Sequence, residues 1–224
     1  MWEGQVFPFT LALFFKPKGA RVLVAFDFDG TITDRDSLQD FIRRMRGWPV
    51  CIRAYLVCVP RVLYWDRGPQ RRQAIKHRFL RSALGGLSRA QVQALADTYV
   101  RDYVPQIVRP EMMERVRAHR ERGDTVVLVS ASPSIYLQPW AQAQGMVQVL
   151  ATELAFDEQK GCVGMASANC WGQEKVNRLR AWLGDKPVEL DMAYGDSPGD
   201  EQMLAHTRQP WLRGRDTALP DLET

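Results

Sequence analysis

Two aspartates separated by one residue follow an apolar run near the start of the chain. The stretch is VLVAFDFDGT at 22–31, which places Asp27 and Asp29 on either side of Phe28. The run predicts a buried strand whose carboxyl end carries the chemistry. In open α/β sheets, ligands bind at that edge. A loop at Gly30 would bring the second carboxylate over the first, so one acid can be the nucleophile and the other the acid and base.

Polar residues also follow two later predicted strands, and a lysine lies near the start of a predicted helix. The strand at 125–129 runs into Ser-Ala-Ser-Pro at 130–133, and the strand at 188–194 runs into GDSPGD at 195–200. A helix opening after 133 would offer its N-terminal amides to an anion. Lys175 lies in the first turn of the helix predicted at 172–183. The helix dipole disfavours a base there, so we expect this lysine to be functional.

Strands and helices alternate from residue 106 onward, whereas the segment before it predicts helices alone. The fold class is therefore α/β, with a Rossmann-like three-layer core, a mostly parallel sheet and an inserted all-helical cap. We expect the core at 1–35 and 106–224 and the cap at 36–105. Within the core, 147–154 and 162–167 are predicted to pair as a hairpin around DEQKG, and a short helix is predicted to end near His206.

The predicted cap contains three helices with recognisable ends. Asp36 is a plausible N-cap for the first helix, and Gly47 is expected to end it. The second helix is predicted at about 70–84, closed by the glycine pair at 85–86. Ser88 is expected to open the third, which runs to about Tyr103.

The charge of this ordinary globular composition is unevenly placed. The 224 residues are 46% hydrophobic and 25% charged, with a net charge of +4. Eleven Lys and Arg against the single acid Asp66 give 41–82 a charge of +10, whereas the remainder carries −6. Such a segment favours an anionic partner, either a polyanionic substrate or an acidic membrane. A solvated basic face without a partner is equally compatible with the sequence.

The apolar part of this segment, 48–65, leaves two interpretations. Arg53, Pro60 and Arg61 interrupt it, which argues against a transmembrane helix. On a helical wheel Arg46, Arg53 and Arg61 share one side, and the opposite side is apolar with aromatic residues at its ends. That pattern is typical of an interfacial helix. A cap helix whose apolar face packs on its neighbours is the favoured alternative, because Pro60 would break a long interfacial helix.

The cysteines and the N-terminal run bear on the compartment. Four cysteines without disulfide or metal-ligand spacing favour a reducing, cytoplasmic location, with the inner face of a membrane as a possible peripheral site. The apolar run at 6–15 follows Glu3 in place of a basic region, so no cleaved signal peptide is expected. The run is too short to span a bilayer and is expected to be interfacial or to pack on the protein.

Taken in order, these motifs resemble a known superfamily. The order strand-DxDGT, strand-SxS, helix-borne Lys and strand-GDSxxD is similar, over nearly the whole chain, to haloacid dehalogenase (HAD) phosphohydrolases. The helical insertion and NCWGQEKVNRL at 169–179 resemble the C1-capped branch, subfamily IB, typified by phosphoserine phosphatases. The Ser-Pro at 132–133, the Asp-rich loop after the first motif and the arginine-rich cap are similar to the phosphatidylglycerophosphatase C group of that branch.

The resemblance implies a Mg²⁺-dependent phosphomonoesterase that works through an aspartyl-phosphate. Asp27 would attack phosphorus, and Asp29 would protonate the leaving group and then activate water. The implied phosphate-binding residues are Gly30, Thr31, Ser130, Ala131 and Lys175. The implied metal ligands are Asp27, the main-chain carbonyl of Asp29, and Asp196, with Asp200 acting through water or by orienting Lys175. Phosphoryl transfer needs cations and amides around the equatorial oxygens, and Mg²⁺ prefers such hard oxygen ligands.

The substrate is predicted less narrowly. Phosphoserine phosphatases usually carry Gly-Gly after the second-motif serine, where this chain has Ala131 and Ser132. The expected substrate is therefore an anionic phospholipid head group of the phosphatidylglycerophosphate kind, with a small soluble, phosphoserine-like metabolite as the alternative. Two other classes stay open, a phospho-accepting signalling module and a basic nucleic-acid-binding protein. The helical insertion and Asp29 argue against the first, and the lack of a recognition motif makes nucleic acid an unlikely partner.

Overall fold

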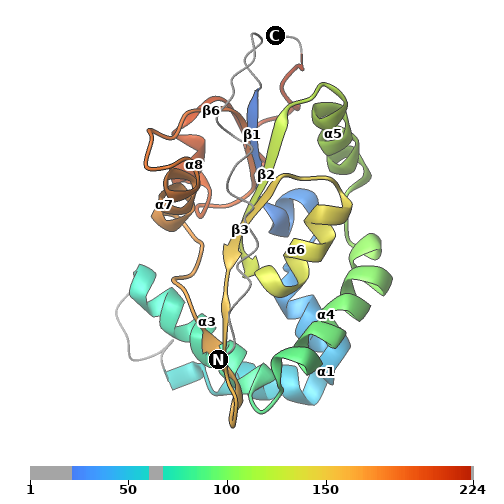
Figure 1. Ribbon diagram of the computed structural model, residues 1–224, viewed down its shortest axis with the longest axis vertical. Helices are drawn as coiled ribbons and strands as arrows, with labels where there is room; N and C mark the ends of the chain where they lie inside the picture. Colours follow the sequence, from blue (N-terminus) through green and yellow to red (C-terminus); the bar gives the residue numbers. More distant parts are fainter. Residues whose placement is uncertain (1–21, 61–67, 223–224) are drawn as a thin grey trace, which may run out of the picture.

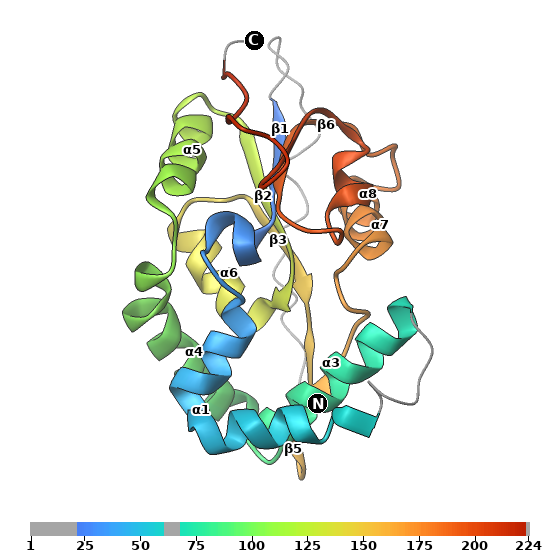
Figure 2. The ribbon, with the colours of Figure 1, turned by 180° about the vertical axis from the view of Figure 1, so that it is seen from behind.

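A computed structural model describes residues 22–60 and 68–222 and shows a parallel sheet between two layers of helices (Figures 1 and 2). The sheet order is β3-β2-β1-β6-β7, and every neighbouring pair is parallel. Its strands are β1 (Leu23–Phe26), β2 (Thr125–Pro133), β3 (Gln148–Thr152), β6 (Leu190–Gly195) and β7 (Thr207–Leu212). The flanking helices are α5 (Pro110–Glu121), α6 (Ser134–Ala143), α7 (Gln173–Trp182) and α8 (Glu201–Leu204). The predicted α/β, Rossmann-like fold with a helical insertion is confirmed.

Each face of the sheet has its own hydrophobic core, because successive strand residues point to opposite sides. Val24 and Phe26 point toward α5 and α6, where they join one buried cluster. Ala25 points to the other face, where Val176 of α7 and Met203 of α8 belong to a second cluster. In Figure 1, α7 and α8 cover one side of the sheet and α5 and α6 cover the other.

The central strand β1 lies where the chain order of the sheet reverses. Phe26 is paired with Leu128 of β2 on one side and with Tyr194 of β6 on the other. The chain fills one half of the sheet with β2 and β3, and the other half with β6 and β7. Such a switch point leaves a crevice beyond the carboxyl ends of the strands. The residues that follow β1 and β6 therefore meet there.

The inserted segment forms the predicted helices, with one correction at Gly47. The helices are α1 (Ser37–Leu56), α3 (Pro69–Leu84) and α4 (Arg89–Asp102), followed by one turn, η2 (Val104–Gln106). Asp36 caps α1 by accepting from Gln39 N at 2.8 Å, and Ser88 caps α4 with a full capping box. Gly47 has φ 81° and interrupts α1, but the helix resumes directly after it and reaches Leu56. The division at residues 36 and 105 stays a prediction.

The pairing predicted for one strand segment was wrong, and one strand was not predicted at all. The segment predicted at 147–154 divides, because β3 joins the main sheet next to β2 and only β4 (Leu154–Asp157) enters the hairpin. Its partner is β5 (Gly161–Met165), and this hairpin packs against α3. Strand β7 was missed. It carries Pro210 and lies at the edge of the sheet, where a proline is tolerated and the periodic signal is weak.

The second half of α1 turns its large apolar side chains outward, contrary to the favoured packing interpretation. The residues that it buries are Cys51, Ala54 and, just beyond its end, Cys58. The arginines lie toward α3: Arg46 Nε donates to the carbonyl of Ala83, and Arg53 donates to the carbonyl of Ser82 at 2.7 Å. The helix is thus amphipathic, but its large apolar side chains do not supply the packed face.

Three further features concern the compartment predictions. The four cysteines are buried and form no disulfide within the described residues. Among residues 22–60 and 68–222, none of the helices has the length and apolar character needed to cross a bilayer. The apolar run at 6–15 lies outside the described residues, so its predicted role stays a prediction.

Candidate active site

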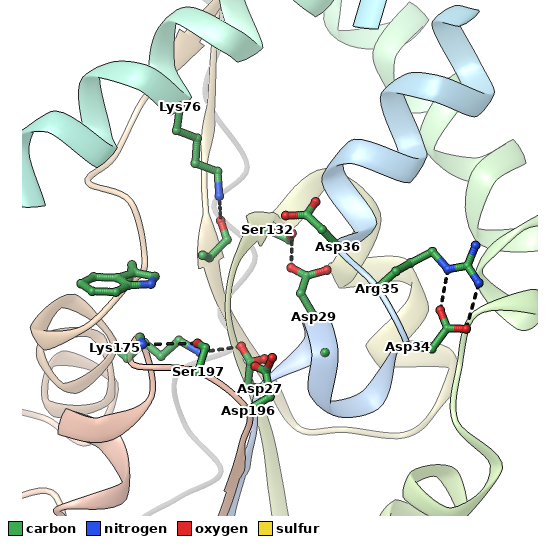
Figure 3. A pocket seen from close by; sticks show the side chains of 14 residues that line it. Asp27, Asp29, Asp34, Arg35, Asp36, Lys76, Ser132, Lys175, Asp196 and Ser197 are labelled. Atoms are coloured by element: carbon green, nitrogen blue, oxygen red, sulfur yellow. Dashed lines mark hydrogen bonds and ion pairs between the residues drawn. The ribbon is translucent and has the colours of Figure 1, made fainter. Parts of the chain in front are cut away.

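Lys175 connects two buried carboxylates at the carboxyl edge of the sheet. Its Nζ lies 2.5 Å from Oδ1 of Asp27 and 2.6 Å from Oδ1 of Asp200, and it donates to the carbonyl of Val129 at 2.8 Å. The side chain starts from the first turn of α7 and is buried. Figure 3 shows it reaching across the end of the sheet toward Asp27. These two acids explain why a lysine lies in the first turn of α7, where the helix dipole alone would disfavour it.

The charges at this edge do not balance. Burial by itself would lower the pKa of Lys175, but Asp27 and Asp200 outweigh burial and raise it, so the amine stays an ammonium. One ammonium cannot neutralise three acids. Burial, with the charges of Asp200 and Asp29, raises the pKa of Asp27 despite Lys175, and burial together with Asp200 raises the pKa of Asp196 to about 6. The edge therefore holds excess negative charge, which a cation would relieve.

Three carboxylates at this edge can approach one metal ion. Asp27, Asp196 and Asp200 each offer an oxygen, and these atoms lie within 4.8 Å of one another. Asp200 is already engaged: its Oδ2 accepts from the amides of Asp196 and Ser197 and from the Ser197 hydroxyl, each at 3.1 Å. Hard oxygen donors with uncompensated charge fit Mg²⁺. Asp27 and Asp196 are the better placed ligands, and Asp200 orients Lys175 and the loop after β6.

Gly30 is required by this arrangement. Its φ is 78°, a conformation that other residues rarely adopt, and a Cβ atom built on it would lie 2.0 Å from Oδ2 of Asp196. The first-motif loop, η1 (Phe28–Ile32), can therefore approach the third-motif aspartate only with glycine at this position. Its role is to permit close approach of the two loops.

Asp29 is held apart from the Lys175 cluster by groups of the cap and of β2. Its Oδ1 accepts from the backbone amide of Ser37 at 2.6 Å, and its Oδ2 accepts from Oγ of Ser132 at 2.5 Å. Burial, followed by the charge of Asp36, raises the pKa of Asp29 above its ordinary value. A carboxyl with a raised pKa suits a general acid. The two acids of the first motif thus have different surroundings and can take different roles.

The contact with Ser37 joins Asp29 to a buried polar network between α1, α4 and α6. The Ser37 hydroxyl lies 3.0 Å from the hydroxyl of Tyr136, and Tyr99 donates to the carbonyl of Ser37 and to Asp40. Ser37 is the first residue of α1, so the start of the cap and the position of the acid depend on each other. Movement of α1 would change the hydrogen bonding of Asp29.

A cleft of about 430 Å³ lies between α3 and the end of the sheet, and it gathers most of the predicted residues (Figure 3). The predicted residues that line it are Asp27, Asp29, Gly30, Ala131, Lys175 and Asp196. Three others, Thr31, Ser130 and Asp200, are buried outside its lining. The Ser130 hydroxyl accepts from the amide of Ser132 at 3.0 Å, which supports the loop from behind.

Ser132 enters the cleft through an irregularity in β2 that the sequence did not reveal. The pairing of β2 with β3 shifts between Ser130 and Pro133, which is the geometry of a bulge. Bulges redirect side chains next to active sites. With this shift, the Ser132 hydroxyl donates to Asp29, and the carbonyl of Ala131 points toward α3. The second serine of Ser-Ala-Ser was the only signal for this role.

The cap contributes two side chains that were not singled out. Lys76 of α3 donates to the carbonyl of Ala131 at 2.6 Å and lines the cleft, as Figure 3 shows. Within the described residues it forms no ion pair, and burial lowers its pKa. Arg72, one turn earlier, has its guanidinium 4.4 Å from the ring centre of Trp171, which also lines the cleft. Nothing in an arginine-rich segment distinguished these two positions beforehand.

The fold and the site together define a Rossmann-like hydrolase with an aspartate pair at the end of its central strand. A model of the haloacid dehalogenase-like hydrolases matches residues 24–205, and the chain belongs to that family. The chain is 35% identical to protein CicA of Caulobacter vibrioides over 82% of each chain. It is 27% identical to a probable phosphatase of Mycobacterium tuberculosis, over 83% of this chain and 66% of that protein.

Solved structures agree with the fold. A protein of unknown function from Bordetella pertussis Tohama I superposes with a TM-score of 0.67 at 23% identity, over 85% of this chain and 88% of that one. A substrate-bound phosphoserine phosphatase superposes with a TM-score of 0.56 at 17% identity, over 87% of both chains. The family match confirms the predicted superfamily and hydrolase class, and the solved structures share its fold.

Proposed function

We propose that the protein is a Mg²⁺-dependent phosphomonoesterase that forms an aspartyl-phosphate on Asp27. The observation that carries the proposal is the different environment of the two first-motif acids. Asp27 contacts the ammonium of Lys175, whereas Asp29 is hydrogen-bonded to neutral donors. A nucleophile must be ionised to attack and a general acid must hold a proton. Burial raises the pKa of Asp27, but the ammonium of Lys175 opposes that rise, and a bound Mg²⁺ would favour the ionised form further. At Asp29, burial and the charge of Asp36 raise the pKa, which favours the protonated form.

In the first half of the reaction, a carboxylate oxygen of Asp27 forms a bond to phosphorus while the bond from phosphorus to the leaving oxygen breaks. Asp29 gives its proton to that oxygen, so an alcohol departs. In the second half, Asp29 takes a proton from water, whose oxygen bonds to phosphorus as the bond to Asp27 breaks. Inorganic phosphate leaves, and Asp29 is protonated again. Lys175 stabilises the charge on the phosphoryl oxygens in both halves.

Mg²⁺ would be held by Asp27, Asp196 and the main-chain carbonyl of Asp29, and when bound it would neutralise charge on the phosphoryl group. Lys175 and Asp200 place Asp27 for attack. Ser130 supports the loop that carries Ser132, and the backbone near Gly30, Thr31 and Ala131 is the proposed binding region for the phosphoryl oxygens.

The leading substrate class is an anionic phospholipid head group that ends in a phosphomonoester, and a soluble phosphoserine-like metabolite is the alternative. Lys76 supports a negatively charged leaving group in either case, because its ammonium lies at the cap side of the cleft without a carboxylate partner in the described residues. A cation in such a position is stabilised by an anion that enters with the substrate. The match to phosphoserine phosphatase structures fits the soluble alternative.

The test is a phosphatase screen with Mg²⁺ that includes p-nitrophenyl phosphate, O-phosphoserine and phosphatidylglycerophosphate in detergent. We expect turnover that chelation removes, together with a phosphoenzyme that hydroxylamine cleaves. Asp27→Asn should remove both the turnover and the phosphoenzyme. Asp97→Asn is the matched control. Asp97 is an exposed residue of α4 that accepts a hydrogen bond from Gln93 and has no proposed role in the reaction. Appreciable turnover by Asp27→Asn would overturn the assignment of the nucleophile.

A further inference from the structure

An exposed apolar stripe follows the second half of α1. Its members are Trp48, Ile52, Tyr55, Leu56 and, just beyond the helix, Val59, which are between 43% and 63% exposed. At 3.6 residues per turn, the four positions on the helix lie within an arc of about 100°. They are five of the six large hydrophobic side chains that are exposed among the described residues. Such a concentration marks an interaction surface.

The opposite side of the same helix cannot provide the interaction surface, because it is already engaged. Cys51 and Ala54 are buried against the rest of the cap. Arg53 donates to the carbonyl of Ser82, and Arg78 of α3 donates to the carbonyl of Val57 at 2.7 Å. These bonds hold two exposed guanidinium groups beside the stripe. The surface therefore combines a row of apolar side chains with cations fixed along one edge.

We propose that this stripe docks the enzyme on the surface of an anionic lipid bilayer. An interfacial helix buries its apolar face at the boundary of head groups and acyl chains while its basic residues attract acidic lipids. The aromatic rings of Trp48 and Tyr55 suit the head-group level. The surrounding segment 41–82 carries a charge of +10 in the sequence, which complements an anionic surface.

The charge of this segment also favours an anionic bilayer over a second copy of the chain as the partner of the stripe. A symmetric dimer through the stripe would place the same arginine-rich segment of each copy against the other, and like charges would oppose it. An anionic bilayer reverses the sign of that interaction. Figures 1 and 2 place this half of α1 at the end of the molecule far from the C-terminus.

The experiment measures flotation of the full chain with vesicles of phosphatidylcholine alone, or of phosphatidylcholine mixed equally with phosphatidylglycerol. We expect binding to the mixed vesicles that added salt weakens. The double variant Ile52→Asn with Leu56→Asn should bind at least about tenfold more weakly, because two apolar side chains leave the interface. Val147→Asn is the matched control, since Val147 is 58% exposed and lies outside the stripe. Both variants should hydrolyse p-nitrophenyl phosphate like the unmodified enzyme, which also shows that they are folded.

Each other outcome overturns the proposal. If the unmodified protein does not float with phosphatidylglycerol, the stripe has another occupant. Equal binding to both kinds of vesicle would remove the electrostatic part of the argument. Equal binding by the double variant would assign lipid affinity to another segment, such as the apolar run at 6–15. Loss of self-association rather than of flotation in the double variant would identify the stripe as a contact between copies.

Discussion

The carboxyl edge of the sheet buries charged side chains, whereas the second half of α1 exposes apolar ones. At the sheet edge, Lys175, Asp27 and Asp200 are charged groups buried together. On α1, apolar side chains such as Ile52 and Leu56 lie in solvent. Both arrangements are costly in an isolated protein, since each leaves groups in an unfavourable medium. The difference fits the two proposed sites, chemistry at the edge of the sheet and membrane docking on the cap.

The largest effect is expected from removing the charge at the edge. Lys175→Met keeps the approximate size of the side chain but leaves Asp27 and Asp200 buried without their cation. We expect turnover of p-nitrophenyl phosphate to fall by at least about a thousandfold. The free energy of unfolding should fall by about 3–5 kcal/mol, as when one partner of a buried ion pair is removed. Steady-state kinetics and urea denaturation measure the two effects.

A second substitution tests whether the stability loss comes from charge. Adding Asp200→Asn to Lys175→Met removes one of the two stranded carboxylates, so the double variant should be more stable than the single one. Activity should stay low, because the cation at the phosphoryl group is still missing. A double variant that is less stable than Lys175→Met would show that Asp200 supports the loop mainly through Asp196 and Ser197.

The next largest effect concerns the acid. Asp29→Asn cannot supply a proton, so hydrolysis of alkyl phosphates should fall by about two to three orders of magnitude. Phosphorylation by p-nitrophenyl phosphate should be less affected, because that leaving group needs little protonation. Ser132→Ala should change the same ratio of alkyl to aryl turnover, by a smaller factor, since it removes one hydrogen bond from Asp29. Equal losses with both substrates in Asp29→Asn would contradict the division of roles.

The sequence contained enough to bring the proposed catalytic groups together at one edge of the sheet, because each lies in a short motif next to a strand or at the start of a helix. Parallel strands bring their carboxyl ends together, so Asp27 and Asp196 could be placed at one edge without coordinates. Lys175 was found because its position in the helix was otherwise unfavourable. These inferences need only local pattern and sheet topology.

The rest depends on contacts between distant segments, which no local pattern encodes. Lys76 resembles the other basic residues of its helix until α3 is placed against Ala131. The bulge that redirects Ser132 arises from pairing between β2 and β3. The orientation of α1 was misjudged for the same reason. The helical wheel is amphipathic in either orientation, and the orientation is fixed by the bonds from Arg46 and Arg53 to carbonyls at the end of α3.

A smaller effect should separate recognition from chemistry. Lys76→Met should raise KM by about tenfold for whichever anionic substrate the enzyme hydrolyses, because one charge-assisted hydrogen bond is lost. Its kcat should change little, since Lys76 contacts Ala131 rather than Asp27 or Asp29. With p-nitrophenyl phosphate, whose leaving group has no second charge, neither constant should change much. A fall in kcat for both substrates would place Lys76 in the catalytic step.

The smallest effect tests whether the cap and the core unfold together. One hydrophobic cluster runs from Val24 and Phe28 of the core to Phe41, Leu80 and Tyr99 of the inserted helices. Because this one cluster spans both parts, we expect a single unfolding transition. Ser88→Ala removes the capping box of α4 and should cost about 1 kcal/mol, whereas Ser88→Asp should keep most of the cap. Turnover of p-nitrophenyl phosphate should be unchanged in both. If Ser88→Ala instead produced an early, separate transition in urea, the inserted helices would be an independent unit, and the predicted boundaries at 36 and 105 would then mark a domain in the thermodynamic sense.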